Sequence, residues 1–237
     1  IEIFKILNEA KPTHLIHLAW YTEHDKFWNA EENITWINKT TNLIRNFCEI
    51  GGKSVIAAGS CAEYSWDTSK KLSENSSCEP KTIYGISKNV TRQLTSIICG
   101  QAGVNLAWCR IFFPYGPRDK ESKLIPLLKN ITNNSKELFE IKYPGSRDFL
   151  HINDIAEAIF TVLDKNVDGI INICSSISYD LDDLLIKALK HKGLNFNERK
   201  LANTDNKQKI VSIVGSNQML LKLGWKPKED LYKYILE

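Results

Sequence analysis

The sequence predicts an α/β fold built on a doubly wound parallel sheet, and three observations support this prediction. Short apolar runs alternate along the chain with stretches whose apolar residues recur at helical spacing. The short runs are continuously apolar, which is typical of strands that are buried on both faces beneath helices. The chain has 237 residues, of which 43% are hydrophobic, so it can bury a sizeable core.

The first half of the chain contains three predicted strands and two long predicted helices. The opening residues, IEIFKILNEAKP, have the character of the end of a helix. Strands are predicted at 13–20 (THLIHLAW), 53–60 (KSVIAAGS) and 105–113 (NLAWCRIFF), and helices at 32–52 and 84–100. Both helices end at glycine, which adopts the left-handed conformation of helix ends at little cost.

After Pro114 the pattern is less regular. Helices are predicted at 122–132, 153–164 and 181–192, a strand is predicted at 169–175, and residues 223–235 are predicted to form a small helical cap.

Charge and composition exclude several classes of protein. The net charge of +3 is too weak to indicate nucleic-acid binding. No stretch reaches the roughly 18 apolar residues of a membrane span, and the charged N-terminus does not resemble a signal peptide. The six cysteines are scattered without CxxC spacing, so we expect no metal site and a reducing, cytoplasmic compartment.

Three residues form a candidate catalytic group. Ser60 ends a predicted strand, at the edge where open α/β sheets bind ligands, while Tyr84 and Lys88 lie one turn apart on the next helix. A lysine ammonium favours the phenolate of a nearby tyrosine, so the tyrosine can exchange a proton with a substrate oxygen. The spacing alone is weak evidence, and the alternative is an exposed Tyr and Lys on a helix surface.

Several further motifs occur in a fixed order around this group. They are HLIHLAW (from 14), NKTTNLI (from Asn38), GSCAEYSW (from 59), YGISK (from 84), RIFFPYGP (from 110) and RDFLHINDIAEAI (from 147). Together they resemble the extended short-chain dehydrogenase/reductase family of nucleotide-sugar epimerases, dehydratases and reductases, over about residues 5–190. Ordered motifs are more specific than any single one, and they favour the catalytic interpretation of Tyr84 and Lys88.

The resemblance implies a role for each matching residue. Ser60 would orient the substrate oxygen, Tyr84 would be the acid/base, and Lys88 would tune Tyr84 and hold the nicotinamide ribose. With these two, Ala19, Asn38 and Pro114 would contact the cofactor, NAD or NADP. For Asn38 the alternative is an ordinary exposed helix residue.

The substrate implied by the resemblance is a nucleotide sugar. Arg147 would grip its diphosphate, because a guanidinium matches phosphate oxygens, and the alternative is a surface ion pair with Asp148. Tyr115 and Tyr21 would contact the substrate. Tyr115 and Pro117 would shape the loop near the cofactor, although an aromatic residue after a buried strand is more often core.

The sequence departs from the family's pattern at its N-terminal end. The family begins with a G-x-x-G-x-x-G turn that holds the cofactor pyrophosphate at a helix N-terminus, and no such turn occurs in these 237 residues. We therefore expect a truncated Rossmann-like sheet that lacks on the order of 60 residues of the family layout. The residue that separates NAD from NADP lies in that part, so the choice stays open.

A second departure concerns the reaction. The family's 4,6-dehydratases carry Asp-Glu after the active-site Ser/Thr, where this chain has Cys61 and Ala62, which disfavours a dehydratase. Glu63 comes one place later and would face the other side if the segment is extended. Phe113 replaces an Asn that contacts the sugar diphosphate in the family.

Aromatic residues also occur at the end of the first predicted strand and directly after it, where members of the family usually have small residues. They either line a sugar pocket or simply pack. They are Trp20, Tyr21 and, beside them, His24.

The resemblance divides the chain into two parts. Residues 1–115 are the partial dinucleotide-binding core, whose last strand returns at about 150–175, and residues 116–237 are mainly the substrate-binding portion. The expected function is an NAD(P)-dependent nucleotide-sugar 4-ketoreductase or 4-epimerase. The alternative is a non-catalytic remnant that binds a sugar nucleotide or a protein partner. Helices 32–50 and 84–100 correspond to the family's dimer bundle, so a homodimer is expected.

Overall fold

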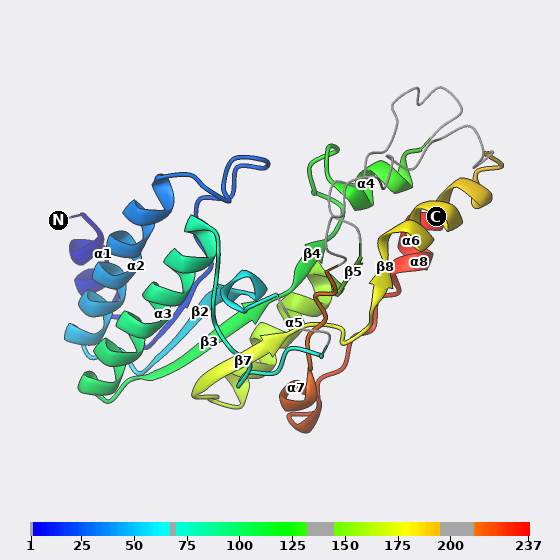
Figure 1. Ribbon diagram of the computed structural model, residues 1–237. Helices are drawn as coiled ribbons and strands as arrows, with labels where there is room; N and C mark the ends of the chain where they lie inside the picture. The colour runs from blue at the N-terminus through cyan, green and yellow to red at the C-terminus, as the bar shows by residue number, and fades with distance from the viewer. Residues whose placement is uncertain (1, 67–69, 132–144, 195–210) are drawn as a thin grey trace.

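A four-stranded parallel sheet forms the centre of the computed structural model, which describes residues 2–66, 70–131, 145–194 and 211–237. The strand order is β1-β2-β3-β7, so the sheet contains crossovers as expected for an α/β fold (Figure 1). The strands are β1 (His14–His17), β2 (Ser54–Ser60), β3 (Asn105–Ile111) and β7 (Gly169–Ile173).

Helices cover both faces of this sheet (Figure 1). On one face lie α1 (Glu2–Ala10), α2 (Glu32–Glu49) and α3 (Ile83–Ala102), and on the other lie α5 (Ile152–Asp164) and α7 (Gln218–Lys222). Successive residues of a strand point to opposite faces, so Val55 and Ala57 pack against the first layer while Ile56 packs against the second. The predicted α/β class is therefore confirmed.

The edge strand β1 differs from its prediction. We expected a strand over 13–20 that is buried on both faces, but β1 has only four residues, and Ile16 is 44% exposed. The cause is its position, because among the described residues β1 pairs only with β2 and is packed on fewer sides than β2 or β3.

Local sequence signals explain where α3 begins and ends. The Thr82 side chain accepts a hydrogen bond from Gly85 N at the start of the helix. Gly103 ends it in the left-handed conformation with φ of 65°, so the predicted end at Gly100 was wrong by two residues, because Gly100 remains inside the helix.

The C-terminal portion has a hydrophobic core of its own. Its helices are α4 (Leu124–Lys129), α6 (Leu181–His191) and α8 (Leu231–Leu236), and its short strands pair as β4 (Phe113–Tyr115) with β6 (Phe149–His151) and β5 (Ser146–Arg147) with β8 (Tyr179–Asp180). No helix in the described part of the chain is long and apolar enough to span a membrane.

The final segment, residues 211–237, packs against both cores. Leu220 and Trp225 lie in the core beneath the sheet, whereas Leu231 and Ile235 lie in the C-terminal core. Between them, both carboxylate oxygens of Asp154 on α5 accept hydrogen bonds from the backbone of this segment. The segment thus joins the two portions.

Candidate active site

Ser60 ends β2 and starts a short 3-10 helix, η1 (Cys61–Glu63). The Ser60 hydroxyl accepts a hydrogen bond from Ala62 N at 3.2 Å, and the Glu63 carboxylate accepts one from Ser60 N at 2.8 Å. This reciprocal capping holds Ser60 at the carboxyl edge of the sheet. The segment is not extended, so Glu63 does not face the other side in the way that an extended strand would place it.

Tyr84 and Lys88 lie one turn apart in the first turns of α3, as predicted, with the Lys88 Nζ 6.0 Å from the centre of the Tyr84 ring. Gly85 allows α3 to approach η1 closely. A Cβ atom at Gly85 would collide with the carbonyl oxygen of Ala62. The glycine of the YGISK motif thus lets the helix that carries Tyr84 contact the turn that carries Ser60.

The environment of Tyr84 keeps its phenol protonated. Burial raises the pKa of Tyr84 well above its usual value, and a hydrogen-bond interaction with the Ser60 side chain lowers that pKa in part. The side chains of Ser60 and Tyr84 therefore interact, and their catalytic roles stay predictions. At neutral pH this arrangement presents a proton donor.

Lys88 is almost fully buried, at 3% exposure. Its Nζ donates a hydrogen bond to Ala58 O at 2.8 Å, and it lies 3.9 Å from the centre of the Trp20 ring. Burial lowers the pKa of Lys88 to about 7, while the Glu63 carboxylate acts in the opposite direction.

Aromatic side chains surround Tyr84. Phe27 and Trp28 both meet its ring edge to face, at centroid distances of 4.9 and 5.7 Å. Trp66 in turn meets Trp28 edge to face at 6.0 Å. Sequence reasoning did not select Phe27, Trp28 or Trp66. The available signal was the high density of aromatic residues in short polar segments beside the motif residues.

Glu63 belongs to a buried network that sequence reasoning also missed. Its carboxylate accepts hydrogen bonds from Arg110 Nε at 2.9 Å and from Trp108 Nε1 at 2.9 and 3.1 Å. Glu63 and Arg110 are 0% and 1% exposed. Gly59 makes room for this network, because a Cβ atom there would collide with the Trp108 indole nitrogen. The network anchors the turn that follows Ser60 to β3.

Arg147 lies near the same turn. Arg147 is 9% exposed. Burial raises the pKa of the Cys61 thiol to about 12, and the positive charge of the nearby Arg147 acts in the opposite direction. Its guanidinium donates to Ser146 O at 3.0 Å and to Val211 O at 2.7 Å. The alternative of a surface ion pair with Asp148 is wrong because both side chains are buried; Asp148 instead accepts hydrogen bonds from Ser175, Ser176 and Gly215.

The other predicted contact residues are more dispersed. Ala19, Asn38 and Pro114 are exposed, and their cofactor roles stay predictions. Tyr115 packs in the C-terminal core, where its ring centre lies 5.1 Å from those of both His151 and Tyr234. This agrees with the alternative that Tyr115 is a core residue. Tyr21 is half-buried and donates a hydrogen bond to Glu23. The structure therefore brings Ser60, Tyr84, Lys88 and Arg147 into one region, and Tyr115 lies apart in the second core.

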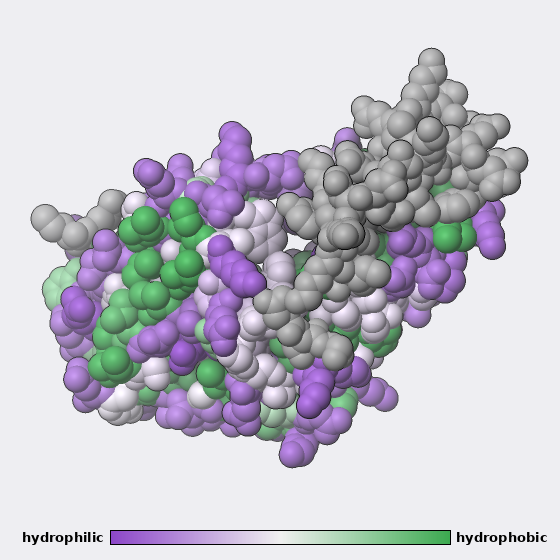
Figure 2. All heavy atoms as spheres, viewed as in Figure 1, coloured by the Kyte–Doolittle hydropathy of each residue, from purple (hydrophilic) through white to green (hydrophobic). Residues whose placement is uncertain are grey.

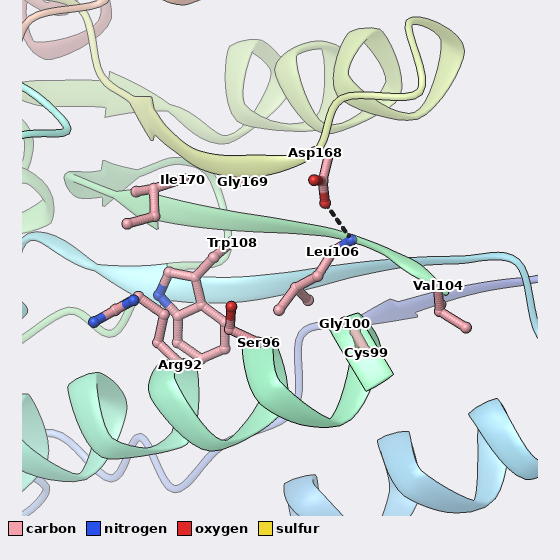
Figure 3. A pocket seen from close by; sticks show the side chains of 10 residues that line it. All are labelled: Arg92, Ser96, Cys99, Gly100, Val104, Leu106, Trp108, Asp168, Gly169 and Ile170. Carbon is pink, nitrogen blue, oxygen red and sulfur yellow. Dashed lines mark hydrogen bonds between the residues drawn. The ribbon is translucent and has the colours of Figure 1, made fainter. Parts of the chain in front are cut away.

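A cavity of about 190 Å³ lies between α3 and the strands β3 and β7 (Figure 3). Arg92 and Ser96 line it from the helix, the ring of Trp108 lines it from β3, and Asp168 accepts a hydrogen bond from Leu106 N at its rim. Its lining includes none of the predicted site residues.

Comparison with known proteins assigns the family. The model of the NAD dependent epimerase/dehydratase family matches residues 2–174. The chain belongs to this family. A curated member, the dTDP-6-deoxy-L-talose 4-dehydrogenase (NAD(+)) of Aggregatibacter actinomycetemcomitans, is 25% identical over 163 residues, which are 68% of this chain and 59% of that protein. The chain thus spans less than two thirds of the length of this family member.

Solved structures of the epimerase/dehydratase family share the fold. The UDP-glucose 4-epimerase of Thermotoga maritima, solved with UDP-glucose, superimposes with a TM-score of 0.82 at 17% identity, covering 99% of this chain and 78% of that one. A dTDP-glucose 4,6-dehydratase of Streptomyces venezuelae, solved with NAD, gives a TM-score of 0.83 at 19% identity, covering 98% and 74%.

Proposed function

We propose that the protein is an NAD(P)-dependent oxidoreductase that acts at C4 of a nucleoside-diphosphate hexose or deoxyhexose, as a 4-ketoreductase or a 4-epimerase. The observation that carries this proposal is the grouping of Ser60, Tyr84 and Lys88 at the carboxyl edge of the sheet. Membership of the family and likeness to a sugar-nucleotide 4-dehydrogenase support it.

In the reducing direction Tyr84 gives its proton to the C4 oxygen of the keto-sugar. The raised pKa of Tyr84 suits this step, because the phenol is protonated before the reaction. The Ser60 hydroxyl hydrogen-bonds to the same oxygen and orients it, and the Lys88 ammonium stabilises the phenolate that forms. In an epimerase the same three groups act in both directions, with rotation of the keto-sugar in between.

The residues of this region fit the nicotinamide half of the cofactor. An ammonium has three donors, and Ala58 O uses one of those of Lys88, so others can serve the ribose hydroxyls. Ala19, which the resemblance also assigns to the cofactor, is small and exposed just beyond β1. NAD(P) supplies or accepts the hydride of the reaction.

Elimination of water is disfavoured by the residues after Ser60. Cys61 and Ala62 cannot act as the acid and base, since the pKa of the Cys61 thiol is raised by burial to about 12. Glu63 is held by Arg110, Trp108 and Ser60 N, so its oxygens are already occupied. Both observations favour a reductase or epimerase over a dehydratase.

Two further features support a nucleotide-sugar substrate and a homodimer. Arg147, close to Cys61, can bind the diphosphate of the substrate.

Helices α2 and α3 carry a band of exposed apolar side chains that a second copy would cover (Figure 2). It contains Ile34, Ile86, Leu94 and Ile97, between 42% and 58% exposed. The six free cysteines agree with a reducing, cytoplasmic location.

The proposal is tested by NAD(P)H oxidation with UDP- and dTDP-4-keto-hexoses and by interconversion of the C4 epimers of UDP- and dTDP-hexoses. Tyr84→Phe should lower turnover at least about 100-fold, the usual effect of losing an acid/base group. Tyr232→Phe is the matched control, because it removes the same hydroxyl from a tyrosine that packs against the C-terminal core and has no assigned role in the site. Turnover of Tyr84→Phe equal to wild type refutes the assignment. Binding of the sugar nucleotide without any turnover in the wild type would favour the non-catalytic alternative.

A further inference from the structure

The indole of Trp20 is fixed more firmly than simple packing requires. Its Nε1 donates a hydrogen bond to Asn33 Oδ1 at 2.8 Å. Asn33, at 0% exposure, donates in turn to Phe27 O at 2.7 Å and to Ala30 O at 2.9 Å. The start of α2 and the loop before it therefore set the position of the Trp20 ring.

Lys88 is the group that this ring faces. Its Nζ lies 3.9 Å from the ring centre, well within the range of a cation–π interaction, and it also donates to Ala58 O. Such an interaction is strongest where water is excluded, and both side chains are buried here. Burial alone favours the neutral amine of Lys88, whereas the Trp20 ring and the Ala58 carbonyl favour the ammonium.

Three other titratable groups face Lys88 from the elements around it. On β1, His17 has a pKa that burial lowers to about 4, so it is neutral at pH 7 and adds no positive charge. In η1, Glu63 attracts the ammonium. On α3 itself, Tyr84 has its ring 6.0 Å from Nζ. None of the three therefore places a second positive charge beside the Lys88 ammonium at neutral pH.

We propose that Trp20, anchored by Asn33, is a positioning residue that holds Lys88 as an ammonium in the place where it serves Tyr84 and the cofactor ribose. The role in catalysis rests on the proposed function, whereas the effect on the charge of Lys88 does not. When Lys88 loses its proton, the phenolate that forms at Tyr84 loses the positive charge beside it and keeps only the hydrogen-bond interaction with Ser60. Trp20 thus extends the pH range of activity toward alkaline values.

The charge of Lys88 can be measured without any activity. In protein labelled with ¹³C at lysine Cε, a ¹H–¹³C spectrum recorded against pH gives the pKa of each lysine, and Lys88→Arg identifies the signal. We expect ring-current-shifted Hε signals for Lys88 in the wild type. Trp20→Leu should remove this shift and lower the pKa of Lys88 by about one unit. Trp20→Phe, which keeps a ring, should lie between the two.

The matched control is Trp36→Leu. It makes the same change in a ring 5.9 Å from Trp20 that is paired with Lys39 rather than Lys88, so the pKa of Lys88 should not change. An unchanged or raised pKa of Lys88 in both Trp20 variants overturns the inference. If Trp20→Leu does not fold, Trp20→Phe decides alone: a pKa of Lys88 equal to that of the wild type overturns the inference, and a lowered pKa supports it.

The pH profile of kcat/KM then tests the catalytic part. The alkaline limb should move to lower pH by about one unit in Trp20→Leu and stay in place in Trp36→Leu. A lowered Lys88 pKa with an unmoved alkaline limb would show that the ammonium is not used in the reaction. Absence of turnover in the wild type would contradict the proposed function and leave the measured effect of Trp20 on Lys88 intact.

Discussion

Replacing Glu63 with glutamine removes one negative charge from an ion pair that is closed off from water. Arg110 then keeps a buried positive charge with no counter-charge, and breaking a buried pair in this way costs about 3–5 kcal/mol. Hydrogen bonding adds to the cost. Three N–H donors, on Ser60, Trp108 and Arg110, converge on the carboxylate, and an amide offers them only one oxygen. We expect Glu63→Gln to lose about 4 kcal/mol of unfolding free energy.

A double-mutant cycle separates the pair from its surroundings. Arg110→Met should by itself cost a similar amount, because it leaves the Glu63 carboxylate buried without its cation. The double variant carries neither charge and should lose at least about 2 kcal/mol less than the sum of the two single losses. Urea unfolding followed by circular dichroism provides the free energies, with equal m-values as the check on two-state behaviour.

The exposed pair of Lys228 and Glu157 provides the control, because its side chains are 61% and 48% exposed. Lys228→Ala should cost less than about 1 kcal/mol. If the two losses at Glu63 and Arg110 add within about 0.5 kcal/mol, the pair is not energetically coupled and the reasoning is wrong.

Three further predictions concern pH, substrate and assembly. His17 has a pKa of about 4 when folded and an ordinary value of 6.5. The unfolded chain thus takes up the proton first, and stability falls as pH decreases through this window. His17→Gln should remove a loss of about 2 kcal/mol between pH 7 and pH 5; equal pH dependence in both proteins would contradict it. Arg147→Ala should weaken UDP or dTDP binding by about 2 kcal/mol in calorimetry, with Arg147→Lys intermediate, and unchanged affinity removes Arg147 from the site. The proposed homodimer predicts dimers for the wild type and monomers for Ile97→Glu in light scattering; a dimer in both proteins would place the interface elsewhere, and a monomeric wild type would contradict the homodimer.

Strands β2 and β3 and helices α2 and α3 could be predicted from the sequence because their signals are local. Apolar runs, helical spacing and terminal glycines depend on neighbours in the chain. The position of Tyr84 and Lys88 on one helix face follows from the same local geometry.

The edge position of β1, the turn at Glu63 and the contact between Trp20 and Lys88 could not be predicted in this way. Each depends on segments that are distant in the sequence: Glu63 meets Arg110 47 positions later. The pattern of apolar and polar residues along a segment carries no information about such distant partners. A charged residue three positions after the end of a buried strand was the one available signal for Glu63, and it does not identify the counter-ion.

The final segment has a consequence for how the molecule can move. Residues 211–237 pack first into the core beneath the sheet and then into the C-terminal core. This one segment therefore contributes buried side chains to both portions of the chain, before and after residue 115. A hinge there would have to pull Trp225 or Leu231 out of a buried position. The two portions should therefore unfold together in a single cooperative transition, and substrate should enter by local movement rather than by opening of two rigid bodies.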